Sequence, residues 1–201
     1  MKRKKWIVGL AVFVLVASVA ERIVYVNASA RQVVEERYDM HEWVDLDGAF
    51  HDTAKEQTQG YSVRVNSAEL TSYSNYIAQY NGDDNLVPES SRPEKIIDVE
   101  VTIKNTGNTD GHVMLFVWGL QTVNDEWVPC VELWSLSQPN VDDNAKKMNF
   151  VLKPDSEYTM SIPYKSNGGY EQLYHTYPIE DQYGLVVSRA PVKKIIHIPL
   201  I

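Results

Sequence analysis

The histidines and carboxylates of this 201-residue chain do not form a recognisable catalytic motif. The segment His41-Glu42-Trp43-Val44-Asp45 begins like a zinc-protease helix, but an aspartate stands where that motif needs a second histidine. The Gly-x-Ser-x-Gly elbow is missing, and no glycine precedes a lysine as a phosphate-binding loop requires. The sequence therefore predicts no catalytic residue, no metal site and no cofactor, and it favours a protein that is not an enzyme.

Two acidic turns contain oxygen ligands of the kind that calcium prefers. They are Asp45-Leu46-Asp47-Gly48 and Asn105–Asp110. Neither has the spacing of a complete calcium loop, and both fit ordinary turns equally well. The sequence leaves a bound calcium ion open without predicting one.

Tyrosine is the residue type with the clearest functional appeal, because exposed aromatic rings stack on sugars and anchor protein partners. The chain has 12 tyrosines, and two groups of three recur at close spacing. We take these six as candidate ligand-binding residues: Tyr73, Tyr76, Tyr80, Tyr170, Tyr174 and Tyr177. The alternative is that each group packs a short helix or loop onto the domain.

Charge and cysteine content exclude several classes of partner. The chain carries 19 basic and 27 acidic residues, and four of the basic residues stand together at Lys2–Lys5. The rest of the chain is therefore strongly acidic and repels phosphate backbones, so we expect no nucleic-acid partner. Cys130 is the single cysteine, which excludes an internal disulfide, and its apolar neighbours predict a buried, unreactive thiol.

The N-terminus has the composition of an export signal. Lys2–Lys5 precede the uncharged run Trp6–Ala20. Continued to Val26, a helix would measure about 31 Å at about 1.5 Å per residue, enough to cross a bilayer with its basic end inside. We therefore expect residues 1–26 to be a signal anchor, with the membrane as a partner. Ser18-Val19-Ala20 also fits a signal-peptide cleavage site, in which case the protein would be secreted after cleavage at Ala20.

The rest of the chain divides into a linker and one domain. Residues 27–39 are compatible with helix and are expected to form a stalk, and residues 40–201 a single domain. In the segment 95–104 apolar residues alternate with polar ones, which predicts a strand with Ile97, Val99, Val101 and Ile103 facing a core. Turn-forming residues follow, so a second strand at about 112–123 is expected to pair with the first.

Short strands separated by turns continue to the end of the chain. They are expected at 61–70, around Cys130, and at 149–152, 157–164, 183–188 and 193–200, with a short helix over 72–80 capped by Ser72. Irregular segments are expected at 134–147 and 165–181. The pattern predicts an all-β, immunoglobulin-like antiparallel β-sandwich with short helical insertions, preceded by one N-terminal transmembrane or signal helix.

The chain also resembles a group of bacterial membrane-anchored or secreted immunoglobulin-like domains of unknown function, akin to immunoprotective-antigen-like extracytoplasmic domains. The resemblance rests on the N-terminal anchor, on the run from Val99 to Gly107, and on Leu152-Lys153-Pro154-Asp155 before an alternating strand. The Trp43–Gly48 motif and the closing Pro191–Lys194 look like a narrower subfamily. The group has glycine where this chain has Asp155. The resemblance implies a fold and a side of the membrane, and it brings no catalytic residue.

These features lead to one expected function with two alternatives. We expect a non-enzymatic interaction module that presents a β-sandwich at the bacterial cell surface to an unknown protein or cell-envelope partner. The first alternative is a carbohydrate- or cell-wall-binding module that uses exposed tyrosines. The second is an unrecognised enzyme, which would need a pocket that joins a histidine to carboxylates.

Overall fold

The computed structural model describes residues 2–29, 33–80, 89, 92–128, 130, 150–166 and 180–200; the side chains of residues 2–5, 7–11, 28–29 and 166 fall outside that description. The chain divides into two compact units, Met1–Gln32 and Val33–Ile201. The segment expected to be irregular at 134–147 lies outside the described residues, as do residues 167–179 of the one expected at 165–181.

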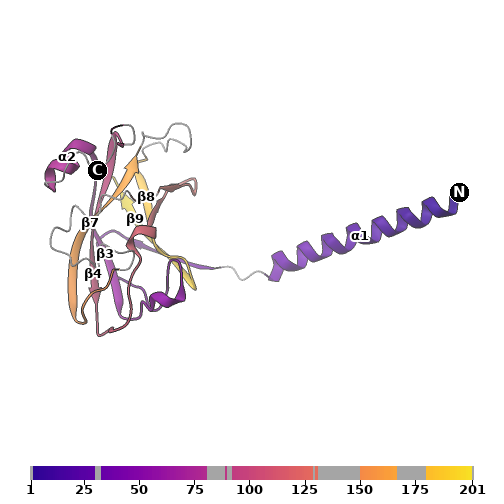
Figure 1. Cartoon of the computed structure of the whole chain (residues 1–201), viewed down its shortest axis with the longest axis horizontal. Coiled ribbons are helices and arrows are strands. Elements are labelled where there is room, and N and C mark those ends of the chain that lie inside the picture. Colours follow the sequence, from indigo (N-terminus) through magenta and orange to yellow (C-terminus); the bar gives the residue numbers. More distant parts are fainter. Residues whose placement is uncertain are drawn as a thin grey trace. The chain divides into compact units, whose positions relative to one another are not determined.

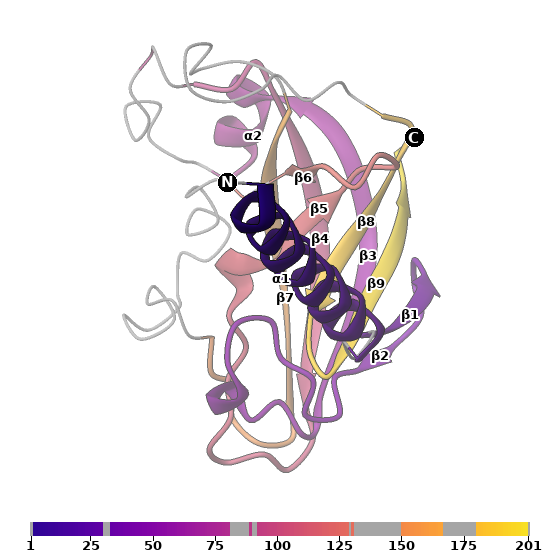
Figure 2. The same cartoon turned by 90° about the vertical axis from the view of Figure 1, so that its right-hand side faces the viewer.

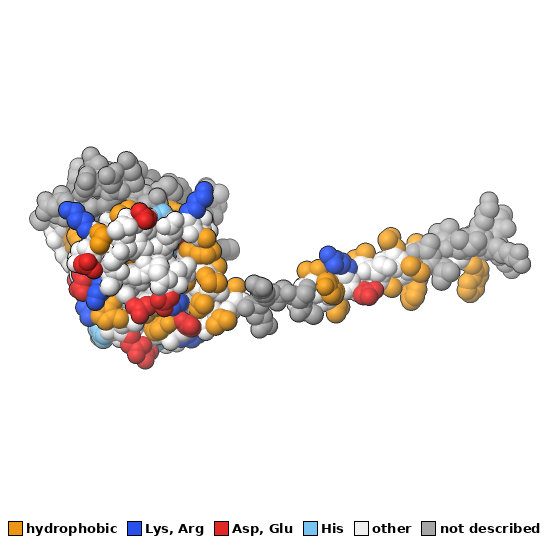
Figure 3. Space-filling model, turned by 90° about the horizontal axis from the view of Figure 1, so that it is seen from below, with side chains coloured by type: hydrophobic (Ala, Val, Ile, Leu, Met, Phe, Trp, Pro, Cys, Tyr) orange, Lys and Arg blue, Asp and Glu red, His pale blue; other side chains and the backbone are white. Residues whose placement is uncertain are grey.

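The first unit consists of one helix, α1 (Lys2–Ser29) (Figure 1). Large apolar side chains along its described part are exposed, as Figure 3 shows, with Phe13 70% and Leu15 65% accessible. The expected apolar run Trp6–Ala20 falls partly on residues 7–11, whose side chains are not described. Within the described residues, no helix combines the length and the apolar character needed to span a membrane.

The second unit is mostly β, with two sheets that can be followed in Figure 2. One sheet has five strands in the order β1 (Val34–Asp39), β9 (Val192–Pro199), β8 (Gln182–Ser188), β5 (Gly119–Gln121) and β6 (Trp127–Val128). The other has four, in the order β2 (Val44–Asp45), β3 (Tyr61–Ser72), β4 (Lys95–Asn105) and β7 (Ser156–Ser166). Every pairing is antiparallel except that of β1 with β9.

The alternation predicted for β4 is confirmed. Its inward residues are fully buried between the sheets: Ile97, Val99, Val101 and Ile103. Opposite them, the other sheet contributes Leu120, Leu185 and Ile196 to the same core. β-Branched side chains suit this position because they pack well on a pleated surface. Burial of such side chains supplies about 1.5–3 kcal/mol each, so β4 is the centre of the core.

The predicted partner of β4 was wrong. Residues 112–123 do not form one long strand beside it; they contain a short 3-10 helix, Leu115–Val117, and the short strand β5. β5 lies in the other sheet, and β4 pairs with β3 and β7 instead. The physical reason is the polar turn after β4, in which Asn105 and Asn108 side chains bind neighbouring backbone groups and redirect the chain.

The predicted stalk is also partly wrong. Residues 34–39 form β1, which pairs in parallel with the whole of β9 up to His197. A buried lysine holds this corner: Lys194 Nζ donates to the Asp45 carbonyl at 2.6 Å and lies 3.4 Å from a Glu36 carboxylate oxygen. The charged residues Glu35, Glu36 and Arg37 are compatible with a helix, but here they lie in a strand at the edge of the sheet.

Other sequence predictions are confirmed within a few residues. The helix α2 (Tyr73–Gln79) begins after Ser72, whose hydroxyl accepts a hydrogen bond from the Asn75 amide at 3.1 Å. Its apolar stripe packs on Ile96, which points to the outer face of β4. The prediction for Cys130 is met only in part: the residue is half-buried and forms an isolated bridge with Tyr164 rather than a strand, and its thiol donates to the Phe116 carbonyl at 3.1 Å.

Candidate binding pocket

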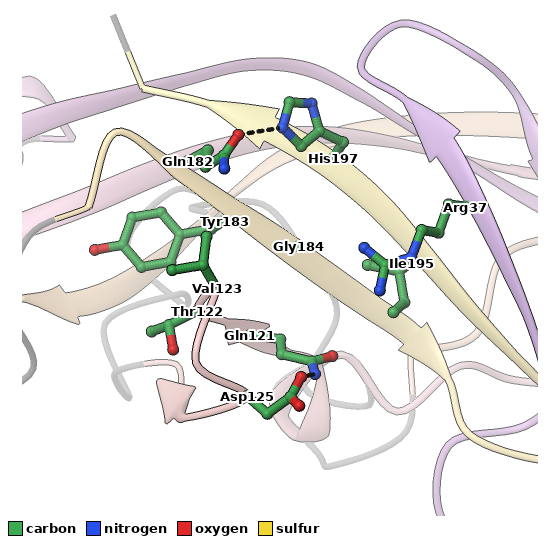
Figure 4. A pocket seen from close by; sticks show the side chains of 10 residues that line it. All are labelled: Arg37, Gln121, Thr122, Val123, Asp125, Gln182, Tyr183, Gly184, Ile195 and His197. Carbon is green, nitrogen blue, oxygen red and sulfur yellow. Dashed lines mark hydrogen bonds between the residues drawn. The ribbon is translucent and has the colours of Figure 1, made fainter.

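A cavity of about 130 Å³ lies on the outer face of the five-stranded sheet. Its floor is Gly184 on β8, which pairs with Gln121 on β5 and with His197 on β9. Because Gly184 lacks a side chain, a hollow remains between its neighbours; a Cβ there would lie 2.6 Å from Ile195 Cγ2. Figure 4 shows this bare stretch of β8 between the side chains that line the cavity.

A chain of hydrogen bonds runs along one wall of the cavity. Lys193 Nζ donates to Glu35 Oε2 at 3.1 Å and to Gln121 Oε1 at 2.9 Å. The Arg37 guanidinium binds the other oxygen of Glu35, with its Nε at 2.8 Å. At the far end, the Gln121 amide donates to the Asp125 carboxylate. Three strands and the turn after β5 thus contribute polar groups, and the hydrogen bonds between these groups fix their positions.

The charges around the cavity are nearly balanced. The hydrogen bond from Lys193 is the largest influence on Glu35 and holds the pKa of that carboxyl below its usual value, so Glu35 is ionised at neutral pH. Arg37 and Lys193 provide two positive charges, and Glu35, Asp125 and Glu180 provide three negative charges. The cavity therefore attracts neither strong anions nor strong cations as a whole.

The opposite end of the cavity is held by a second set of contacts. His197 Nε2 and Gln182 Oε1 are 3.0 Å apart, as drawn in Figure 4. The Val123 amide donates to a Glu180 carboxylate oxygen at 2.9 Å, and the Glu180 amide donates to the Tyr183 hydroxyl at 3.0 Å. These bonds tie the turn after β5 to the start of β8 and fix the width of the opening.

This arrangement can bind a small polar molecule. Its donors and acceptors are already oriented by internal hydrogen bonds, which lowers the ordering cost of binding. The volume is below the range of about 300–1,000 Å³ that holds drug-sized ligands, so the cavity suits a molecule of few heavy atoms.

The predicted tyrosine site lies elsewhere, on the outer face of the four-stranded sheet. Tyr73 and Tyr76 are buried and Tyr80 is half-buried, all three on or next to α2. The other three candidates, Tyr170, Tyr174 and Tyr177, lie outside the described residues. For the described group, the ring faces of Tyr73 and Tyr76 contact the protein, as the packing alternative predicted.

The tyrosine hydroxyls end in a buried polar cluster. Tyr76 Oη lies 3.0 Å from Ser161 Oγ, Tyr80 donates to Asp98 Oδ2 at 3.2 Å, and Ser161 donates to Asp98 Oδ1. Burial raises the pKa of the Asp98 carboxyl, and the two hydroxyl bonds oppose that rise. Because α2 covers the cluster and its groups bind one another, we interpret it as a structural network rather than a ligand site.

Among the described residues, no group of three or more histidine, cysteine, aspartate or glutamate side chains could hold a metal ion. The turn weighed for calcium uses its oxygens internally: Asn108 Oδ1 accepts from the Asp110 and Gly111 amides. The other acidic turn does the same, since Asp45 accepts from the Ser62 hydroxyl at 2.6 Å.

Sequence reasoning missed the pocket. The sequence predicts a stalk at Arg37, and it predicts that Gln121 lies in a strand paired with β4. The one local signal is Gly184, the second residue of the strand predicted at 183–188, because a glycine inside a strand often marks a place where the sheet surface is left bare.

The fold and the pocket define a class: an all-β domain of two sheets with a small polar cavity on one outer face. The family described as a domain of unknown function (DUF5028) matches residues 35–194, and the chain belongs to this family. No curated protein matches the chain. Among solved structures, the chain is similar to the yjhA protein from Bacillus subtilis, with 12% identity, a TM-score of 0.42, and coverage of 80% of this chain and 98% of that one.

Proposed function

We propose that this protein is an extracytoplasmic binding module, in which an immunoglobulin-like domain is exported by the N-terminal helix and stays tethered to the membrane. The pairing order supports the immunoglobulin-like part of the proposal. β3-β4-β7 corresponds to strands A-B-E of such domains, and β9-β8-β5-β6 to strands G-F-C-C′. The parallel pairing of β1 with β9 adds one strand at the edge of the second sheet.

The observation that carries the proposal is the composition of α1. Four cations precede an uncharged run of fifteen residues, Trp6–Ala20, and the described apolar side chains of the helix are exposed. Exposed apolar surface of this extent needs a non-aqueous partner. The cations favour the cytoplasmic side, which would put the β domain outside. Arg22 near the outer end stacks on Tyr25 at 5.5 Å from the ring centroid, a pair suited to an interface.

Protease protection of intact bacterial cells tests this proposal. A full-length chain with a C-terminal epitope is expressed, and the cell wall is removed to give protoplasts. We expect the epitope to pellet with membranes and to be removed by added protease without lysis. An Ala20→Leu variant tests for cleavage: if signal peptidase acts there, the wild type is shorter than the variant and is released into the medium. A protein that stays in the soluble fraction and is degraded only after lysis contradicts the proposal.

A further inference from the structure

We propose that the cavity over Gly184 binds a small zwitterion, a molecule that carries one carboxylate and one ammonium group, of the size of an amino acid or a dipeptide. The inference deepens the proposed function and rests on it only for the compartment in which the ligand is met.

Two opposite charges face each other across the floor of the cavity. In Figure 4 the Arg37 guanidinium reaches from β1 to the edge of Ile195, while Asp125 lies on the other side of Gly184. Each charge has one internal partner: Glu35 binds Arg37 through two guanidinium nitrogens, and Gln121 binds Asp125. A guanidinium has five N–H donors, so Arg37 retains donors for a carboxylate. Among the described residues, Asp125 Oδ2 contacts no donor, and it is the acceptor available to an ammonium group.

A ligand of a single charge would use only one of the two charged ends of the cavity, and the internal bonds partly offset the attraction at that end. A lone anion at Arg37 would lie close to the ionised Glu35, which sits within 2.8 Å of the same guanidinium. A lone cation at Asp125 would lie near Lys193, which donates to the same glutamine side chain. A ligand with both charges meets an opposite charge at each end and adds no net charge to the cavity.

The walls do not favour a sugar. Sugar rings are commonly held against an exposed aromatic face. Tyr183 is the one tyrosine, tryptophan or phenylalanine among the residues that line the cavity, and it is buried, with its hydroxyl bound to the Glu180 amide. The exposed ring of His197 is a small polar imidazole that is bound to Gln182. The floor consists of a glycine backbone and the edge of Ile195. Such a floor accommodates a short aliphatic segment between the two charged groups.

Selective labelling of glycine gives a direct readout in the full-length protein, purified in detergent micelles. The chain has 10 glycines, and Gly184 forms the floor of the cavity. Alanylalanine is titrated as the zwitterionic probe, and acetate, methylammonium and N-acetylglucosamine are titrated separately. We expect alanylalanine to shift the Gly184 amide resonance saturably, while Gly48, Gly60 and Gly107, which lie in turns around the other sheet, stay unchanged.

Two variants that each remove one charge test the two ends of the cavity. Arg37→Gln and Asp125→Asn each remove one charge from an exposed side chain, and each is expected to weaken alanylalanine binding about tenfold, the loss of one charge-assisted hydrogen bond. Arg64→Gln and Asp110→Asn are the matched controls, since Arg64 stacks on Trp43 and Asp110 lies in an exposed loop. An unchanged spectrum in the absence of ligand verifies that each variant is folded.

Several results would overturn the inference. Acetate or methylammonium binding as tightly as alanylalanine would mean that one charge suffices. Tighter binding of N-acetylglucosamine would favour the carbohydrate alternative. Absence of any saturable shift at Gly184 would remove the site. None of these results bears on membrane tethering, which the protease experiment decides separately, so failure of the inference and failure of the proposed function are distinguishable.

Discussion

The outer faces of the two sheets each carry a hydrogen-bonded set of polar side chains, but only one set is sealed. On the four-stranded sheet, α2 covers Asp98 and Ser161, which are both at least 95% buried. On the five-stranded sheet, the chain from Glu35 to Asp125 stays partly exposed around the bare backbone of Gly184.

This difference shows that similar polar side chains take different roles according to whether another part of the protein covers them. A buried polar group usually binds another protein group, because an unsatisfied one costs about 1–3 kcal/mol. The sealed set therefore satisfies itself and stabilises the position of α2. The open set is fixed by its internal bonds but retains donors and acceptors on exposed side chains such as Arg37 and Asp125. A ligand can bind to these remaining donors and acceptors.

Removal of a carboxylate from each face gives the largest expected contrast. Asp98→Ala leaves the Ser161 and Tyr80 hydroxyls without their acceptor, and we expect the free energy of unfolding to fall by about 3 kcal/mol. Asp125→Asn removes an exposed charge and keeps a side chain that tolerates the left-handed backbone of this turn, so it should change the free energy of unfolding by less than about 0.5 kcal/mol. Urea unfolding followed by tryptophan fluorescence measures both. Equal losses for the two variants would contradict the comparison.

A smaller contrast is expected between Tyr76→Phe and Lys193→Met. The first removes a buried hydroxyl that binds Ser161, which keeps its bond to Asp98, so a loss of about 1 kcal/mol is expected. The second breaks a half-exposed ion pair with Glu35, which contributes about 0.5 kcal/mol or less. The same unfolding measurement, repeated at high salt, should reduce only the effect of Lys193→Met. A salt-dependent effect of Tyr76→Phe would contradict this assignment.

The sealed carboxylate also predicts a pH dependence. Burial raises the pKa of Asp98 in the native state above its unfolded value near about 3.9. Above the native pKa the buried charge lowers stability, and as the pH falls through that pKa the native state takes up a proton before the unfolded state does. Asp98 therefore destabilises less at acid pH.

The variant Asp98→Asn isolates this effect, because it stays neutral throughout. The wild type should gain stability relative to Asp98→Asn as the pH falls from about 7 to about 4. Unfolding curves of the two proteins at each pH give the difference directly. A difference that stays constant with pH, or that moves in favour of the variant in acid, would mean that Asp98 is not buried as described.

Local pattern predicted the elements well. Alternation in β4 gave its buried face, Ser72 gave the start of α2, and the strands near the C-terminus were placed within a residue or two. Each of these depends on neighbours along the chain. Local pattern did not predict the long-range strand pairings. β4 pairs with strands that lie about thirty and sixty residues away along the chain rather than with the next strand.

The pocket could not be predicted for the same reason. Arg37, Gln121 and Gly184 come from three strands whose order in the sheet is set by the whole fold, and the parallel pairing of β1 with β9 joins the two ends of the domain. The tyrosines were a visible pattern, but their spacing is equally typical of a helix face that packs on a sheet. Spacing alone does not distinguish a buried ring from an exposed one.

The smallest expected effect concerns two aspartates with the same backbone conformation, one beside each sheet. Asp155, before β7, and Asp125, beside the pocket, have φ values of 57° and 63°, in the left-handed region that favours glycine. Asp155→Gly relieves that strain, and after the entropic cost of glycine in the unfolded chain we expect a gain of about 0.5 kcal/mol. Asp125→Gly relieves the same strain but also removes the carboxylate that binds Gln121.

Thermal unfolding should therefore show a small rise in Tm for Asp155→Gly with unchanged alanylalanine binding, whereas Asp125→Gly should lose binding whatever its Tm. If both variants bind alanylalanine as the wild type does, Asp125 is only a turn residue, and the two faces differ less than their exposure indicates.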